Sequence, residues 1–190
     1  MNAVKHMLAT DRSRILMLLL ATLFCTGCER GPAAPELRNS PVYSNRLEGF
    51  RFLVPDGWNQ SASSNLPQGD LETEAFLVRY SLPTSESGAQ VQVLCFQDKS
   101  GDANLVEHHT LPAFGITNWT LEGEPRIEAV GNREGSWLYY KGINGNKTLG
   151  KEVLCFRKGD RVYSFVGTFG ETDEKARQAI QRAFASVIWE

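Results

Sequence analysis

The chain has 190 residues, 42% of them hydrophobic, with 20 lysines and arginines against 22 aspartates and glutamates. This length and apolar content suit one domain with a substantial core and leave no room for a second. Because the first 27 residues hold three of the basic residues and only one of the acidic ones, the rest of the chain carries a net charge of −4, which gives it no electrostatic reason to bind nucleic acid.

Residues 1–27 have the organisation of an export signal. Basic side chains precede an apolar stretch, 15–24, which is far shorter than the roughly 20 residues needed to span a bilayer. Thr26 and Gly27 are small residues of the kind that a signal peptidase requires, and Cys28 follows directly. This arrangement resembles the lipobox of bacterial lipoproteins, in which the cysteine receives a diacylglycerol and becomes the first residue. An ordinary secretory signal with an incidental cysteine is the alternative.

The segment 28–45 is predicted to be the lipid-bearing cysteine followed by a flexible tether. It holds three prolines and one glycine, and its apolar residues follow no period. Because one acyl chain binds a membrane only weakly, the anchor is expected to carry several chains. Glu29 is not the aspartate that favours inner-membrane retention in enteric bacteria. We therefore expect a cell-envelope protein that faces the periplasm, with the outer membrane preferred over the inner one.

The segment 46–190 is predicted to fold as a single globular α+β domain that begins with three strands. Apolar side chains alternate, as in strands with one buried face, in three segments: 50–54, 74–81 and 89–97. In the second of them, Phe76, Val78 and Tyr80 are expected to share a face. The polar stretch 61–69 is predicted to be a loop. A short helix is predicted over 103–109, before an irregular stretch at 112–119.

The second half of the domain is predicted to be a β-meander and a closing helix. The strands are expected at 126–130, 136–141, 151–157 and 161–169. Asn144-Gly145-Asn146 and Lys158-Gly159-Asp160 are hairpin turns between the last three. Thr172 is the predicted N-cap of an amphipathic helix that packs on the sheet. Its apolar positions repeat with helical spacing: Ala176, Ala179, Ile180, Ala183, Phe184, Val187 and Ile188.

Two parts of the domain resemble the PsbP-like superfamily, which includes photosystem extrinsic subunits and the Ran-binding Mog protein. One is the opening segment 49–58, GFRFLVPDGW, and the other is the hairpin at 161–169 with the helix ending at 183–187, AFASV. The resemblance covers about 43–190 and implies an antiparallel β-sheet flanked by helices, an α/β/α sandwich. Members mostly bind or stabilise partner proteins, so it also implies a protein partner and no enzyme activity. It carries over no functional residue.

Cys95 and Cys155 are the cysteines that remain in the domain when Cys28 bears the lipid. Both lie in the tetrapeptide VLCF within a predicted strand. In an oxidising compartment such a pair can form a disulfide, and two buried thiols on neighbouring strands would look the same in the sequence. Both alternatives stay open.

Few residues of the domain are typical of catalysis or ligand binding. His108 and His109 would be the residues of a hydrolase or metal-dependent enzyme, but solvent-exposed histidines near a helix end are the favoured interpretation. Segment 145–151 nearly fits a phosphate-binding loop, yet Glu152 stands where Ser or Thr must hold Mg²⁺, so no nucleotide is expected.

The favoured function is therefore that of a lipid-anchored envelope lipoprotein whose domain binds a protein or another envelope component. Trp119 and Tyr140, if exposed, would be natural anchors for such a partner. No cofactor or metal is expected. The alternatives are the enzyme that uses His108 or His109 and a purely structural envelope protein.

Overall fold

The computed structural model describes residues 41–83, 85 and 88–190. The predicted signal, the lipidation site Cys28 and the tether up to residue 40 lie outside the described residues. The elements are β1 (Val42–Asn45), β2 (Phe50–Leu53), β3 (Asn59–Ser63), β4 (Ala75–Ser81), β5 (Gln90–Gln97), α2 (Leu105–His108), β6 (Trp119–Leu121), β7 (Arg126–Val130), β8 (Arg133–Asn144), β9 (Lys147–Lys158), β10 (Arg161–Gly170), α3 (Glu174–Ala185) and β11 (Ile188–Trp189). All described residues belong to one compact unit.

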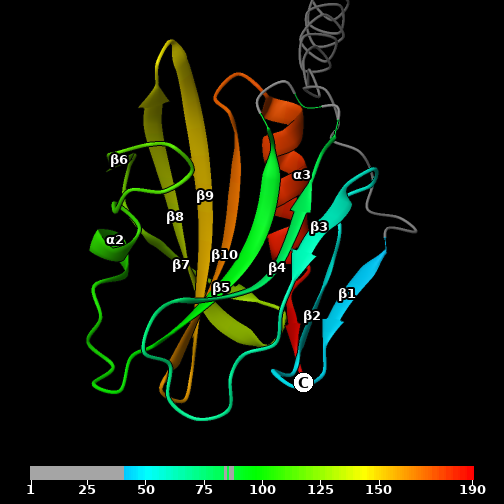
Figure 1. Ribbon diagram of the computed structural model, residues 1–190, viewed down its shortest axis with the longest axis vertical. Coiled ribbons are helices and arrows are strands. Elements are labelled where there is room, and N and C mark those ends of the chain that lie inside the picture. Colours follow the sequence, from blue (N-terminus) through cyan, green and yellow to red (C-terminus); the bar gives the residue numbers. More distant parts are fainter. Residues whose placement is uncertain (1–40, 84, 86–87) are drawn as a thin grey trace, which may run out of the picture. The chain divides into compact units, whose positions relative to one another are not determined.

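The strands form two antiparallel sheets (Figure 1). The larger sheet has eight strands in the order β3-β4-β5-β10-β9-β8-β6, and β7 also pairs with β8. The smaller one has the order β1-β2-β11. The predicted meander is confirmed: β8, β9 and β10 are joined by two-residue turns in which Gly145 and Gly159 have positive φ angles of 60° and 63°.

Helix α3 packs against β9 and β10 of the larger sheet and against β2 of the smaller one. Asp173 is its N-cap, with a side chain that accepts a hydrogen bond from Ala176 N at 3.0 Å, so the predicted cap at Thr172 is one residue early. The helix lies close to the sheet because Gly167 has no side chain. A Cβ atom there would be 2.3 Å from Ile180 Cγ2.

The predicted helix is too long at its C-terminal end. Ser186 ends it, because its hydroxyl donates to Ala183 O at 2.6 Å and accepts from Leu53 N at 2.8 Å. The following residues therefore turn toward β2, and Ile188 and Trp189 pair with it as β11 instead of continuing the helix. The amphipathic face that was predicted from Ala176 onward does face the core as far as Phe184.

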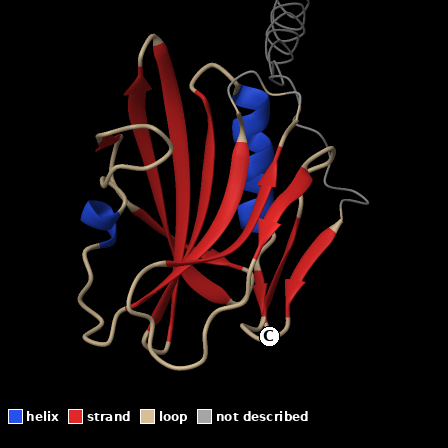
Figure 2. Ribbon diagram, viewed as in Figure 1, coloured by secondary structure: helices blue, strands red, loops and turns tan. Residues whose placement is uncertain are grey.

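The two faces of the larger sheet are covered by different elements of the chain. Its first face meets α3 and the smaller sheet around an aromatic core, in which the Phe50 and Phe165 ring centroids are 5.4 Å apart. Its second face meets α2 and the loops on either side of it. The described part of the chain is thus dominated by strands, and α2 has only four residues, so the predicted α/β/α sandwich is too helical a description (Figure 2).

Three further differences concern strands. β1 occupies 42–45, which was predicted to belong to the tether, and β3 occupies 59–63, which overlaps the predicted loop. In β4 a register shift between Phe76 and Val78 breaks the expected alternation. Phe76 is paired with Leu94 on the second face, whereas Val78 and Tyr80 belong to the core on the first face. The bulge thereby places an aromatic ring next to the cleft described below.

None of the helices in the described part of the chain is long and apolar enough to cross a membrane.

Candidate binding cleft

The second face of the larger sheet carries polar side chains although it is covered. Successive side chains of a strand point to opposite faces, so β10 directs Tyr163 and Phe165 into the aromatic core and Ser164 and Thr168 to the second face. Each of these two polar residues is at most 3% exposed. The pairing register extends this polar region to Arg79 and Gln92 on one side and to Lys151 on the other.

The segment around α2 is fastened over this face by side chains from the sheet. Tyr140 donates a hydrogen bond from its hydroxyl to Val106 O at 2.9 Å, and Trp119 donates from Nε1 to Ala113 O at 3.2 Å. Trp119 and Tyr140 are 2% and 0% exposed, so their predicted role as partner anchors is wrong. They hold the segment in place, because each has a polar tip that reaches a backbone carbonyl while its ring is buried.

Between this segment and strands β4 and β5 there is an open cleft of about 400 Å³. Its polar lining comes from Glu74, Arg79, Gln92, His108, His109 and Lys151. Its apolar lining includes Phe76, Leu94, Leu111 and Phe114. A concave surface with apolar walls and a few converging charged groups is the usual form of a binding site.

Lys151 lies at the floor of the cleft and is 2% exposed. Its ammonium donates to His109 O at 2.5 Å and lies 4.2 Å from the ring centroid of Trp119 and 4.8 Å from that of Tyr140. The aromatic faces attract the cation, but they replace only part of its lost hydration. Burial lowers the pKa of Lys151 to about 7, although the charge of Glu74 opposes the shift.

His108 and Glu74 form a hydrogen-bonded pair on the wall of the cleft. His108 Nε2 is 2.8 Å from Glu74 Oε1, and the imidazole stacks on Phe96 with ring centroids 4.3 Å apart. Their side chains are 25% and 34% exposed, so His108 is the one of the two candidate histidines that a ligand can reach. Within the described residues, no serine, threonine or cysteine is hydrogen-bonded to it as a nucleophile would be.

His109 is buried, which contradicts the prediction that both histidines are solvent-exposed. Its Nε2 lies 3.1 Å from Ser164 Oγ and 3.4 Å from Cys155 Sγ. Burial, aided by the charges of His108 and Lys151, lowers the pKa of His109 to about 3, so the imidazole is neutral and can accept a hydrogen bond from either neighbour. Because burial raises the pKa of Cys155 to about 12, its thiol is not a nucleophile.

Cys95 and Cys155 are both free and both buried. Cys95 is in β5 and belongs to the core on the first face, whereas Cys155 is in β9 and belongs to the cluster on the second face. Strand β10 lies between them, which corresponds to a separation of about 10 Å. The disulfide that the sequence left open is therefore not formed. The alternative of two buried thiols holds, except that their strands are not neighbours.

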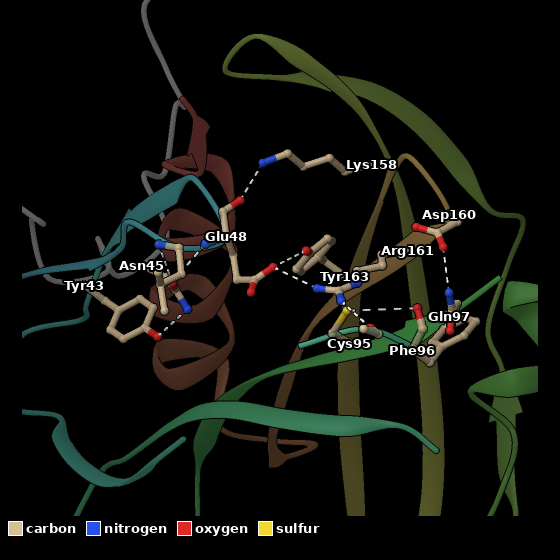
Figure 3. Close-up of polar contacts among 12 residues, drawn as sticks. Tyr43, Asn45, Glu48, Cys95, Phe96, Gln97, Lys158, Asp160, Arg161 and Tyr163 are labelled. Atoms are coloured by element: carbon tan, nitrogen blue, oxygen red, sulfur yellow. Dashed lines mark hydrogen bonds and ion pairs between the residues drawn. The ribbon is translucent and has the colours of Figure 1, made fainter. Parts of the chain in front are cut away.

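A second polar cluster lies on the first face, where the β1–β2 turn meets the β9–β10 hairpin (Figure 3). The Glu48 carboxylate accepts hydrogen bonds from the Tyr163 hydroxyl and from Arg161 Nη1, and Lys158 Nζ donates to Glu48 O. Burial and the bond to Glu48 raise the pKa of Tyr163. The carboxylate of this cluster is bound by Tyr163 and Arg161, and Lys158 lies over the Trp189 ring at 5.1 Å, so the cluster fastens the smaller sheet.

No part of the described chain brings three or more histidine, cysteine, aspartate or glutamate side chains together in a way that could hold a metal ion. The cleft is a place where charged side chains converge beside apolar walls. Of its charged residues, sequence reasoning identified only His108. Lys151 was placed at the end of the predicted strand 151–157, where a lysine is expected to be exposed, so nothing in the sequence singled it out.

Similarity to solved structures identifies the fold of the chain. No protein-family model and no curated protein sequence matches the chain. Cyanobacterial PsbP (CyanoP) from Synechocystis sp. PCC 6803 is similar over 88% of this chain and 99% of its own, with a TM-score of 0.57 and 13% identity. The Ran-binding protein Mog1p of Saccharomyces cerevisiae is similar over 80% of this chain and 95% of its own, with a TM-score of 0.51 and 13% identity.

A mutant form of Mog1 has the same TM-score at 14% identity. The chain therefore has the fold shared by PsbP and Mog1, which confirms the resemblance seen in segments 49–58 and 161–187. Identities this low show the fold alone and assign no residue of the cleft.

Proposed function

We propose that this chain is a partner-binding protein of the cell envelope and that the cleft beside α2 receives a protein. The observation that carries the proposal is the cleft itself, with a buried cation at its floor and Leu111, 56% exposed, in its lining. A concave surface that combines apolar walls with a few converging polar groups is the usual form of a binding site, and Leu111 would be one of the side chains that a partner covers. The fold supports the proposal, because a protein of the same fold, Mog1p, is described as Ran-binding.

The membrane attachment is proposed from the sequence. The short apolar stretch at 15–24, the small residues Thr26 and Gly27, and Cys28 together favour a lipid anchor on Cys28, with the following residues as a tether to the domain. Such an anchor would place the cleft at the periplasmic side of a membrane, preferably the outer one. Cys28→Ser should abolish fatty-acid labelling and release the protein from the membrane fraction. Labelling that persists in the variant would contradict the anchor.

The binding role is tested by capturing partners from envelopes after chemical crosslinking, using the full-length protein and two variants. Leu111→Asp places a charge in the cleft lining. Ile127→Asp is the matched control, since Ile127 is 73% exposed and lies on β7, outside the lining of the cleft. We expect one partner to be captured by the unaltered protein and the control and to be lost with Leu111→Asp. Equal capture by all three would show that the cleft is not the binding site.

Enzyme activity is not part of the proposal. The Glu74–His108 pair is the arrangement that favours the alternative of a hydrolase, because a carboxylate can orient an imidazole as a general base. The pair has no hydrogen-bonded nucleophile among the described residues, and His109 is buried and neutral. Because His108 also lines the cleft, the enzyme is distinguished by a His108→Ala protein that still captures the partner. Loss of cellular function with capture retained would favour the enzyme, whereas loss of both together would not.

A further inference from the structure

The cations of the cleft lack carboxylate partners. Arg79 donates to Gln92 Oε1 from Nε at 3.3 Å and from Nη2 at 3.1 Å, and it lies over the Phe76 ring at 5.3 Å. Lys151 donates to one backbone carbonyl and otherwise faces aromatic rings. Among the ion pairs of the described residues, neither cation takes part in one.

The acids near these cations are already engaged elsewhere. Glu74 is paired with His108 on the wall of the cleft. Glu152 follows Lys151 in β9 but points to the other face, where it accepts from Arg177 Nε at 2.8 Å and from Gln181 Nε2 at 2.7 Å. An ammonium has three donors, and the structure gives Lys151 one hydrogen-bond acceptor. The floor of the cleft therefore has unused capacity for an anion.

We propose that the floor of the cleft binds one aspartate or glutamate side chain of the partner protein, with Lys151 as the contact and Arg79 as a more distant positive charge on the wall. This inference rests on the proposed function and names the chemistry that the partner must present. The carboxylate would supply the acceptor oxygens that Lys151 lacks, and the bond would be strong because the site is shielded from water. Apolar residues beside the acidic one would contact Leu111 and Phe114, which also line the cleft.

The proposal implies a pH dependence of binding. Lys151 must be charged to hold a carboxylate, and burial lowers its pKa to about 7. A bound carboxylate raises that pKa, so binding takes up a proton and the affinity falls as the pH rises above about 7, by up to tenfold per unit. The other titratable or charged groups around Lys151 are His108 and His109 from the α2 segment, Glu74 and Arg79 beside or within β4, and Tyr140 from β8.

The test uses the full chain in detergent micelles, labelled with ¹³C at the lysine ε-carbons. The probes are an acetylated and amidated pentapeptide, Ala-Leu-Glu-Leu-Ala, and its neutral counterpart with Gln in place of Glu. The Lys151 signal is identified by its loss in Lys151→Met. We expect the Glu peptide to move this signal and raise its titration midpoint, and to bind about tenfold or more tightly than the Gln peptide. Arg79→Gln, a change at the wall, should weaken binding of the Glu peptide without abolishing it.

Equal binding of the two peptides, or an unmoved Lys151 signal with both, would overturn the proposal. The comparison of the two peptides is read from the unaltered protein and does not depend on a variant, whereas assigning the Lys151 signal requires that Lys151→Met folds, which its other lysine signals report. The outcome is also separable from that of the proposed function. A partner that is lost with Leu111→Asp but retained with a folded Lys151→Met would refute only the carboxylate site. Selective binding of the Glu peptide without any captured partner would instead refute the protein-binding role.

Discussion

The variant Lys151→Met tests whether burial lowers the pKa of Lys151, because such a shift makes the stability of the folded protein depend on pH. Methionine keeps an unbranched side chain of similar length between Trp119 and Tyr140 but removes the charge. Burial lowers the pKa of Lys151 to about 7 in the folded protein, against an ordinary value of 10.5. Between these two pH values the unfolded chain holds a proton that the folded chain does not. The free energy of unfolding therefore increases with pH between about 7 and 10.5. As the pH falls back toward 7, the folded chain must again hold a buried charge and this increase disappears.

The magnitude follows from the width of the window. Each pH unit inside it is worth about 1.4 kcal/mol, so two measurements two units apart should differ by about 2.7 kcal/mol. The quantity to measure is the free energy of unfolding of the unaltered protein minus that of Lys151→Met, from urea titrations at each pH. Lys147→Met, an exposed position at the start of the same strand, controls for the loss of a lysine from this hairpin. A difference that does not change with pH would show that Lys151 is not a desolvated cation.

Three further predictions concern the fold. Gly167→Ala should lower the free energy of unfolding by about 1–3 kcal/mol, because the new Cβ would press on Ile180, and an unchanged thermal midpoint would show that α3 can move away. Asp173→Ala should cost about 1 kcal/mol through loss of the helix cap, whereas Asp173→Asn should retain most of it; equal losses would contradict the capping role. Thiol titration without reductant should find Cys95 and Cys155 unreactive in the folded protein and both reactive after unfolding, whereas a pair that stays unreactive would reveal a disulfide.

The elements predicted correctly are those in which the order of apolar and turn residues matches their burial in the folded protein. The hairpins at Gly145 and Gly159 combine turn residues with apolar strands, and β2 and β5 alternate regularly. β3 was missed because it is an exposed edge strand with polar residues. β11 was missed because its first residue, Ile188, continues the helical period of α3, and only pairing with β2 makes it and Trp189 a strand.

The cleft was less predictable because it depends on strand order. Lys151 and Arg79 are far apart in the sequence and line the same cleft only because of the strand order, in which β5 and β10 lie between their strands. Trp119 and Tyr140 looked like surface anchors, since nothing local shows that their polar tips find backbone carbonyls beneath the α2 segment. The two cysteines have identical local sequences, and only the position of β10 between their strands separates them.

The central claim, that the cleft beside α2 receives a protein partner, is tested most directly by photo-crosslinking in intact cells. A photoreactive amino acid is placed at Leu111, in the lining of the cleft, and separately at Ile127, which is more exposed but lies on β7. The account predicts one discrete crosslinked product from Leu111 and none of the same mass from Ile127. Crosslinking from Ile127 alone, or the same products from both positions, would contradict it.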